Sequence, residues 1–241
     1  MSVVSIYARL YRDCLRRTLT SIGKSPWTLL LPIGLLLLDI FATGLASQLQ
    51  LGIVGGFIIT AILAALGSCY LYFLGELNGN ARVGLAEFGK SVRTYFWSVV
   101  NVFFVYWVAS LVLSMVLRGS SQAQAAETAL RIVALVLLNA VPEVIYQRNT
   151  YGGLATMQRA VQFLQACWLE WTVPNLVLLG ALYLAVRRAV DELAAPVVEV
   201  VLLVGLIGGL FHGIMVFRGH LFAALDGTSH RQRMFRYRTA A

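Results

Sequence analysis

Apolar residues gather along this chain in long runs, and six of these runs are predicted to cross a lipid bilayer as helices. A spanning helix needs roughly 20 predominantly apolar residues. The runs lie at about 27–46, 51–74, 96–117, 129–146, 174–186 and 196–217. The last begins at Pro196, and its helix can continue to Leu225 with its final turns in water. The pattern predicts an all-α polytopic membrane protein, with a domain over 27–225 that bundles six transmembrane helices.

Three segments between these runs carry apolar residues at helical spacing and predict amphipathic helices that lie along the cytoplasmic membrane surface. The first is the N-terminal segment 1–26, whose apolar face holds Tyr7, Leu10, Tyr11, Cys14 and Leu15. The second face holds Leu85, Phe88, Val92 and Phe96, and the third holds Leu154, Met157, Val161, Leu164 and Trp168. Each precedes an outgoing run, so we expect three units of surface helix, outward span and returning span. Residues 226–241 form a basic C-terminal tail.

Two prolines are expected to mark where the chain leaves and re-enters the bilayer. Pro142 removes a helical hydrogen bond at the inner end of the fourth run, and Pro174 is suited to the first turn of the fifth. Pro142 and Glu143 together form a candidate hinge. Glu143 either accepts hydrogen bonds from the turn at 151–153 or pairs with Arg148 or Arg159.

Composition supports a chain that lies mostly in lipid. Hydrophobic residues make up 59% of the 241 residues and charged residues 12%, about half of what a soluble domain carries. The mean hydropathy is +0.77. No sequence remains for a separate soluble catalytic domain. Residues 29–46 also match a signal-peptide core, but the long charged segment before them favours an uncleaved first helix.

The net charge of +8 predicts orientation. In the six-span arrangement, 15 of the 19 Lys and Arg residues fall on the side of the termini. Because positive residues favour the cytoplasmic side, both termini are predicted to be cytoplasmic in a multi-pass protein of a bacterial inner membrane. The same charge favours contact with membrane lipids. It shows no base-stacking or groove-reading pattern, which argues against nucleic acid as a partner.

Charged residues inside the runs are the candidate functional groups, because each is costly in lipid unless it is paired or wetted. Asp39, Arg131 and Glu199 share one depth near the outer face. Either they form a buried polar cluster that lines a cavity, or Arg131 and Glu199 reach the headgroups while Asp39 bonds within the bundle. Glycines at four-residue spacing predict close helix packing; these are Gly52, Gly56, Gly205, Gly209 and Gly213.

Motifs for catalysis and metal binding are missing from the sequence. Cys14, Cys69 and Cys167 are scattered without a CxxC pair, which suggests small buried hydrophobes. We find no HExxH, no GxSxG and no glycine-rich phosphate loop. No catalytic residue, cofactor or metal is therefore predicted.

A resemblance to a known group adds to the architecture. The residues that carry it are Asn139 to Gln147, Gly152-Gly153-Leu154, Ala160, Phe163-Leu164, Trp168, Glu170-Trp171 and Pro174-Asn175, with Ser25-Pro26-Trp27 before the first run. With these residues the chain resembles bacterial six-span proteins similar to the membrane domain of some glycerophosphodiester phosphodiesterases, and their stand-alone relatives. The catalytic domain of those enzymes is not part of this sequence, so the resemblance implies the membrane architecture alone.

These observations lead to two hypotheses about function. The first is a non-enzymatic scaffold or partner subunit of a membrane complex, with a membrane or cytoplasmic protein as its partner. The alternative is a small permease-type component that transports an amphiphilic or lipid-like substrate. A transporter should bring the charges within its spans into a wet cavity, and broken spans would favour it. A scaffold should close those charges in packed contacts.

Overall fold

Helices make up the part of the chain that the computed structural model describes, which is 3–48, 52–118, 122–150, 152–191 and 197–228, with residues 232 and 235. This part contains no strand. In order the elements are α1 (Val3–Lys24), the 3-10 helix η1 (Pro26–Leu30), α2 (Leu31–Gln48), α3 (Gly52–Asn78), the 3-10 helix η2 (Leu85–Glu87), α4 (Phe88–Thr94), α5 (Phe96–Val116), α6 (Ala123–Leu137), α7 (Val141–Arg148), α8 (Gly153–Asp191) and α9 (Val197–Leu225). The predicted all-α fold class is confirmed.

Five helical segments in the described residues are long and apolar enough to cross a membrane: Pro26–Ala46, Val54–Asn78, Phe96–Val116, Gly153–Asp191 and Val198–Leu225. A sixth follows if α6 and α7, which are bent by 41° against each other, are counted as one span. The chain is thus an integral membrane protein with several helical crossings.

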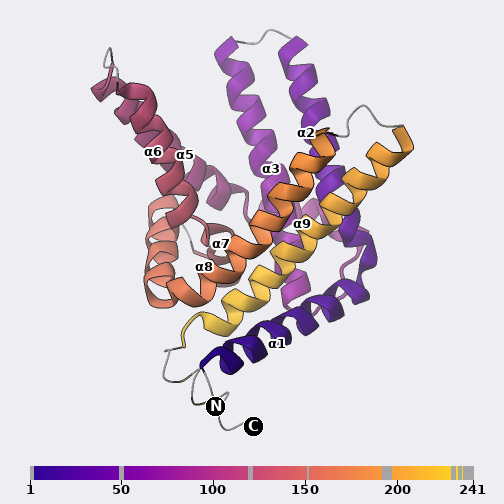
Figure 1. Ribbon diagram of the computed structural model, residues 1–241. Coiled ribbons are helices and arrows are strands. Elements are labelled where there is room, and N and C mark those ends of the chain that lie inside the picture. The colour runs from indigo at the N-terminus through magenta and orange to yellow at the C-terminus, as the bar shows by residue number, and fades with distance from the viewer. Residues whose placement is uncertain are drawn as a thin grey trace.

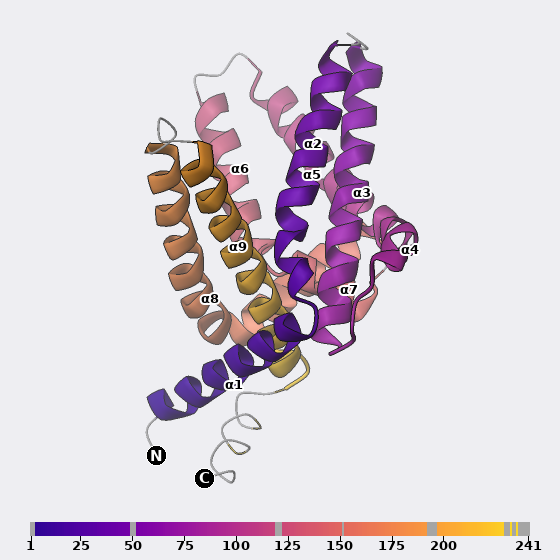
Figure 2. The same cartoon turned by 90° about the vertical axis from the view of Figure 1, so that its right-hand side faces the viewer.

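Three helical hairpins give the molecule its shape (Figures 1 and 2). They are α2–α3, α5–α6 and the second part of α8 with α9. The helix ends that follow one another in each hairpin all lie on one side of the molecule, called the hairpin-turn side below. The N-terminal end of α1 and the C-terminal end of α9 lie on the opposite side, called the base below. A helix precedes each hairpin along the chain: α1, α4 and the first part of α8. This order agrees with the three expected units.

The packed core lies toward the base. Buried residues come from the last turns of α3, from α7, from the first part of α8 and from the last turns of α9, with Leu10 and Cys14 of α1 packed against them. Toward the hairpin-turn side, large apolar side chains such as Phe41, Phe57 and Met115 are exposed. Such an arrangement suits a membrane, because apolar surface in contact with lipid tails has no hydrophobic drive to become buried.

The last turns of α9 correct one expectation. They were predicted to extend into water, but residues from Ile214 to Leu225 include the most buried in the molecule. Helix α1 covers them, and its apolar stripe of Ile6, Leu10 and Cys14 is buried within the protein. A helix forms over the N-terminal segment, but this stripe, which was expected to lie on the membrane surface, faces protein.

The fourth predicted span is broken. One helix was expected over about 129–146, whereas α6 ends at Leu137 and α7 begins at Val141. Pro142 explains the break, because it has no N–H for the carbonyl of Leu138 four residues earlier. The N–H of Val141 binds that carbonyl at 3.0 Å instead, which makes a turn. Pro142 thereby begins α7, where a proline is well tolerated.

The fifth predicted span begins earlier than expected. Helix α8 contains a non-helical residue, Cys167 (φ −135°, ψ 26°), which divides it into α8N (153–166) and α8C (168–191). Pro174 was expected to begin the span but lies inside α8C. Its missing N–H leaves the carbonyl of Glu170 open. The hydroxyl of Tyr11 on α1 donates to that carbonyl at 3.1 Å.

Tyr11 is well suited to that contact. Burial, and then the charge of Glu170, raises the pKa of Tyr11 to about 12. The hydroxyl therefore stays protonated and able to donate at any physiological pH. Tyr7, one turn earlier, donates to the Glu170 carboxylate at 3.3 Å. The two tyrosines fasten the N-terminal helix to α8C.

Close helix packing occurs at other glycines than those predicted. A Cβ atom would meet nothing within 4 Å at Gly56, Gly205 or Gly213, and only Leu29 at 3.9 Å at Gly209. The surroundings of Gly52 lie outside the described residues. At three other glycines an added Cβ would approach a neighbour too closely. It would meet the Asn101 carbonyl at Gly153, Ile33 Cγ1 at 2.6 Å at Gly208, and the side chains of Asn78 and Tyr146 at Gly219.

We expect Gly153→Ala to lower the free energy of unfolding by about 1–3 kcal/mol, because the new methyl group would meet backbone atoms of α5. Gly205→Ala is the matched control, and it should be neutral or stabilising by up to about 1 kcal/mol through helix propensity. Thermal unfolding of both variants in mild detergent measures the difference. Equal melting temperatures would contradict this account of the packing.

Topology reporters test the six crossings. A reporter inserted after Ser121, between α5 and α6, and one after Asn149, between α7 and α8, should be on opposite sides of the membrane. This follows if the bent pair α6–α7 crosses the bilayer. Finding both reporters in one compartment would mean that the pair enters and returns, leaving five crossings.

Candidate functional site

The strongest candidate site is a buried ion pair at the bend between α6 and α7. Arg218 of α9 approaches Glu143 of α7 with two hydrogen bonds, Nε to Oε1 at 2.9 Å and Nη2 to Oε2 at 3.1 Å. Glu143 is 0% exposed and Arg218 is 5% exposed. Such a two-bond contact fixes the geometry of both groups and is among the stronger hydrogen-bonded arrangements in proteins. It joins α9 to the first turn of α7.

Asn139 and Trp171 complete the surroundings of this pair. Nη2 of Arg218 also donates to the backbone carbonyl of Asn139 in the turn before α7. The guanidinium lies over the Trp171 ring, 5.2 Å from its centre, where a cation is attracted by the ring electrons. The indole Nε1 donates to Oδ1 of Asn139 at 3.2 Å. The bend, α8C and α9 therefore meet at one arginine.

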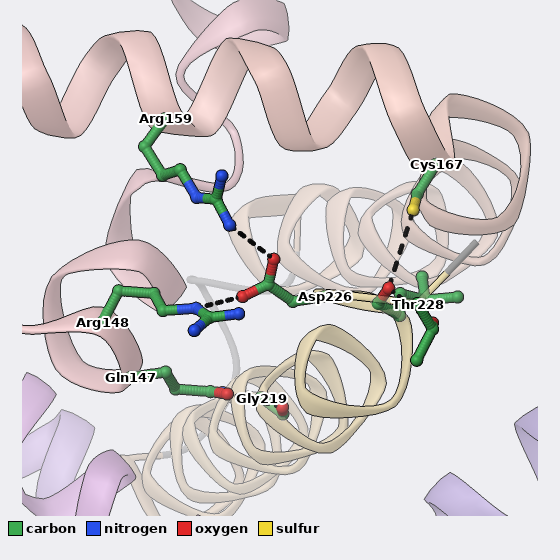
Figure 3. A network of polar contacts seen from close by, with 8 residues as sticks. Gln147, Arg148, Arg159, Cys167, Gly219, Asp226 and Thr228 are labelled. Atoms are coloured by element: carbon green, nitrogen blue, oxygen red, sulfur yellow. Dashed lines mark hydrogen bonds and ion pairs between the residues drawn. The ribbon is translucent and has the colours of Figure 1, made fainter.

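A second charged cluster lies close to the first, just beyond the end of α9 (Figure 3). The carboxylate of Asp226 accepts from Arg148 of α7 and, at 3.3 Å, from Arg159 of α8N. Gln147 of α7 donates to the carbonyl of Gly219 on α9 at 2.8 Å. Figure 3 shows both arginines pointing toward Asp226 from separate helices. This cluster holds α7 and α8N against the end of α9.

The two clusters resolve the alternatives for Glu143. It was expected to accept bonds from the turn at 151–153 or to pair with Arg148 or Arg159. Both of these arginines bind Asp226, and Glu143 binds Arg218. The chain bends by 41° between α6 and α7, next to Pro142 and Glu143, and the Glu143 carboxylate is held by Arg218 of α9.

The predicted cluster of Asp39, Arg131 and Glu199 does not form. Arg131 is exposed and pairs with Glu127 one turn earlier on α6. Glu199 is exposed near the start of α9, and Asp39 is partly buried on α2 with no partner for its Oδ1 among the described residues. A pair at helical spacing satisfies Arg131 locally, so nothing draws it to the other two.

Sequence reasoning overlooked Arg218 because the sixth span was ended at residue 217. Helix α9 is apolar from Val198 to Leu225, and Arg218 lies within that range. A charge inside an apolar helix was the available signal.

Chemically, the arrangement suits support rather than reaction. Both members of the ion pair are buried and hydrogen-bonded, so neither is open to a substrate. Within the described residues no three His, Cys, Asp or Glu side chains lie close enough together to hold a metal ion. His212 on α9 is buried, and its Nδ1 lies 3.4 Å from the Tyr70 hydroxyl. All three cysteines are buried thiols, as predicted.

Comparisons with family models, with curated proteins and with solved structures find no match to this chain. The resemblance to membrane domains of glycerophosphodiester phosphodiesterases therefore stays an expectation from the sequence.

Removing one member of the buried ion pair should destabilise the fold strongly. We expect Arg218→Met or Glu143→Gln alone to cost about 3–5 kcal/mol, because each leaves a buried polar group unpaired. The double variant should cost clearly less than the sum of the two, since no unpaired charge then remains. Chemical unfolding in detergent of the wild type, both single variants and the double variant measures this coupling.

Arg131→Gln is the control for this cycle, because it breaks an exposed pair within one helix. Its expected cost is about 0.3–0.5 kcal/mol. Strictly additive effects for Glu143 and Arg218, or single losses as small as that of the control, would show that the pair contributes little to stability.

Proposed function

We propose that this protein is a non-enzymatic scaffold or partner subunit of a complex in a bacterial inner membrane. Its apolar hairpins would contact the membrane helices of another protein, and its base would face the cytoplasm. The proposal rests on one observation: Glu143 and Arg218 are both buried and form an ion pair with each other. A group that bound or moved a substrate would need access, and these two have none.

The outer parts of the hairpins supply the surface that a scaffold needs. In the apolar window of α5 only 11% of the residues are buried, and in that of the segment Pro26–Ala46 only 17%. On α3, Gly56 and Thr60 are exposed as well, and a Cβ at Gly56 would meet nothing within 4 Å. Small residues in an apolar helix allow another helix to approach closely. These faces favour helix partners in addition to lipid.

Charge supports the cytoplasmic placement of the base. The segments of α1 and α4 and the region from α7 to α8N, together with the chain from Arg218 onward, hold 15 of the 19 Lys and Arg residues. The hairpin-turn side holds Arg118, Arg131, Arg187 and Arg188. Positive charge near the ends of spans favours the cytoplasmic side. We therefore assign both termini to the cytoplasm.

One observation favours the second candidate, a permease-type component for an amphiphilic or lipid-like substrate. The break between α6 and α7 lies in an apolar segment, and interrupted spans often form substrate or ion sites in transporters. In this protein, however, the backbone carbonyl and the side-chain oxygen of Asn139 at the break already accept hydrogen bonds from Arg218 and Trp171. The scaffold role therefore remains the leading proposal.

Site-specific photo-crosslinking in native membranes tests the scaffold role. A photoreactive residue at Phe57, exposed on α3, should capture one recurring membrane protein in near-stoichiometric yield. The matched control is Phe73 on the same helix, which is fully buried and should crosslink only within the chain. Extraction in polymer nanodiscs should then give a particle heavier than the 26.5 kDa chain with its lipid.

Two outcomes would overturn this proposal. One is a chain that crosslinks to lipid alone from Phe57 and is extracted without a partner. The other is flux of an amphiphile through vesicles that contain the purified protein, lost on Gly153→Ala but not on Gly205→Ala. That second result would establish the transport role instead.

A further inference from the structure

We propose that a polar groove at the base, formed by α1, the C-terminal end of α3 and the last turns of α9, binds the phosphate-bearing headgroup of a membrane phospholipid. The groove has a volume of about 460 Å³, and the residues that define its chemistry are Asp13, Arg16, Arg17, Asn78, Asn80 and His220. Neither Glu143 nor Arg218 lines it. The inference does not depend on the scaffold role.

Helix α1 places the groove at the level of the membrane surface. The helix has three faces: a buried stripe with Leu10 and Cys14, a polar stripe that includes Asp13 and Thr20, and an exposed apolar stripe with Leu15 and Leu19. Leu15 is 51% exposed and Leu19 is 65% exposed. A helix with exposed apolar and exposed polar faces lies at the boundary between acyl chains and headgroups.

Arg16 and Arg17 supply the cationic side of the groove. Both are exposed, and neither forms an ion pair with a carboxylate in the described part of the chain. Their guanidinium groups are thus available, and guanidinium is the side chain best matched to phosphate oxygens. By helical spacing Arg16 lies between the polar stripe and the stripe of Leu15 and Leu19. A phosphate at Arg16 would therefore place its acyl chains beside the two leucines.

The opposite wall of the groove supplies acceptors. Asn78, the last residue of α3, donates through Nδ2 to the carbonyl of Leu74 at 2.8 Å. Its Oδ1 is buried and has no partner among the described residues. A buried acceptor of this kind is costly unless a donor reaches it. The hydroxyl or ammonium group of a phospholipid headgroup is such a donor, and Asp13 offers a second acceptor at the same groove.

The remaining polar side chains keep the walls in place. Nε2 of His220 on α9 lies 3.1 Å from the Ser21 hydroxyl of α1, so the two helices are joined at the floor of the groove. Lys24, at the end of α1, donates to Oδ1 of Asn80 at 2.6 Å and so fixes a side chain that lines the groove. A groove that contains both donors (Arg16 and Arg17) and acceptors (Asp13 and Asn78) matches a phosphodiester that carries an amine or a hydroxyl, rather than a bare anion.

Native mass spectrometry of the full chain with short-chain phosphatidylethanolamine and phosphatidylglycerol tests the site. We expect the double variant Arg16→Gln/Arg17→Gln to bind these lipids at least about tenfold more weakly, which is the effect of losing one charge-assisted contact. The control is Arg82→Gln/Arg93→Gln, which removes two exposed arginines near α4 and the same charge. It should retain wild-type affinity within about twofold, because only general attraction is reduced.

A second variant keeps the test valid if the arginine variant fails to fold. Thr20→Trp fills the groove without removing a charge, and it should abolish retention of the lipid while the melting temperature stays unchanged. Equal losses in the arginine variant and its control would overturn the site, since binding would then be general surface attraction. Unchanged binding in Thr20→Trp would also overturn it.

Glycerol phosphate separates a lipid from a soluble ligand with the same phosphate chemistry. We expect it to compete only weakly, because it has no acyl chains to lie along Leu15 and Leu19. If it binds as tightly as the short-chain lipids, the phospholipid assignment is overturned in favour of a soluble phosphate ester.

Discussion

Backbone and side-chain polar groups that have no water to bind must find partners within the protein, and this constraint organises the base of the molecule. Two prolines create the need. Pro142 ends one helix and begins another, and Pro174 leaves the carbonyl of Glu170 without its helical donor. Arg218 binds the turn at the first break, and Tyr11 donates to the carbonyl at the second. Helices from the two ends of the chain are thereby drawn onto the middle.

This arrangement explains why the core lies toward one side. The hairpins meet lipid along most of their length and need little packing there, so their apolar side chains remain exposed. Near the base the chain has bends, short helices and charges, and these require specific contacts. Glu143 with Arg218, and Asp226 with Arg148 and Arg159, supply those contacts. The buried charges are therefore best understood as part of the framework that holds the hairpins together.

Much of the fold was predictable from the sequence, because hydropathy reports directly which segments prefer lipid. The presence of the long apolar helices and of a helix over the N-terminal segment followed from local patterns, whereas the bounds of the fourth and fifth predicted spans did not. Pairing did not follow either. Glu143 was matched with arginines close to it in sequence, but Arg218 lies 75 residues away. Glycine spacing also failed to predict where helices pack closely. Gly205 and Gly208 lie on the same helix, but only at Gly208 would an added Cβ atom meet a neighbour within 4 Å.

The contact between Tyr11 and Glu170 has a consequence for how the chain is made. The two residues are 159 positions apart, so α1 is synthesised well before its partner on α8C exists. Until then its stripe of Ile6, Leu10 and Cys14 has no protein surface to cover and can rest only on the lipid beside the translocon. Docking of α1 onto α8C can therefore occur only after α8C has been made.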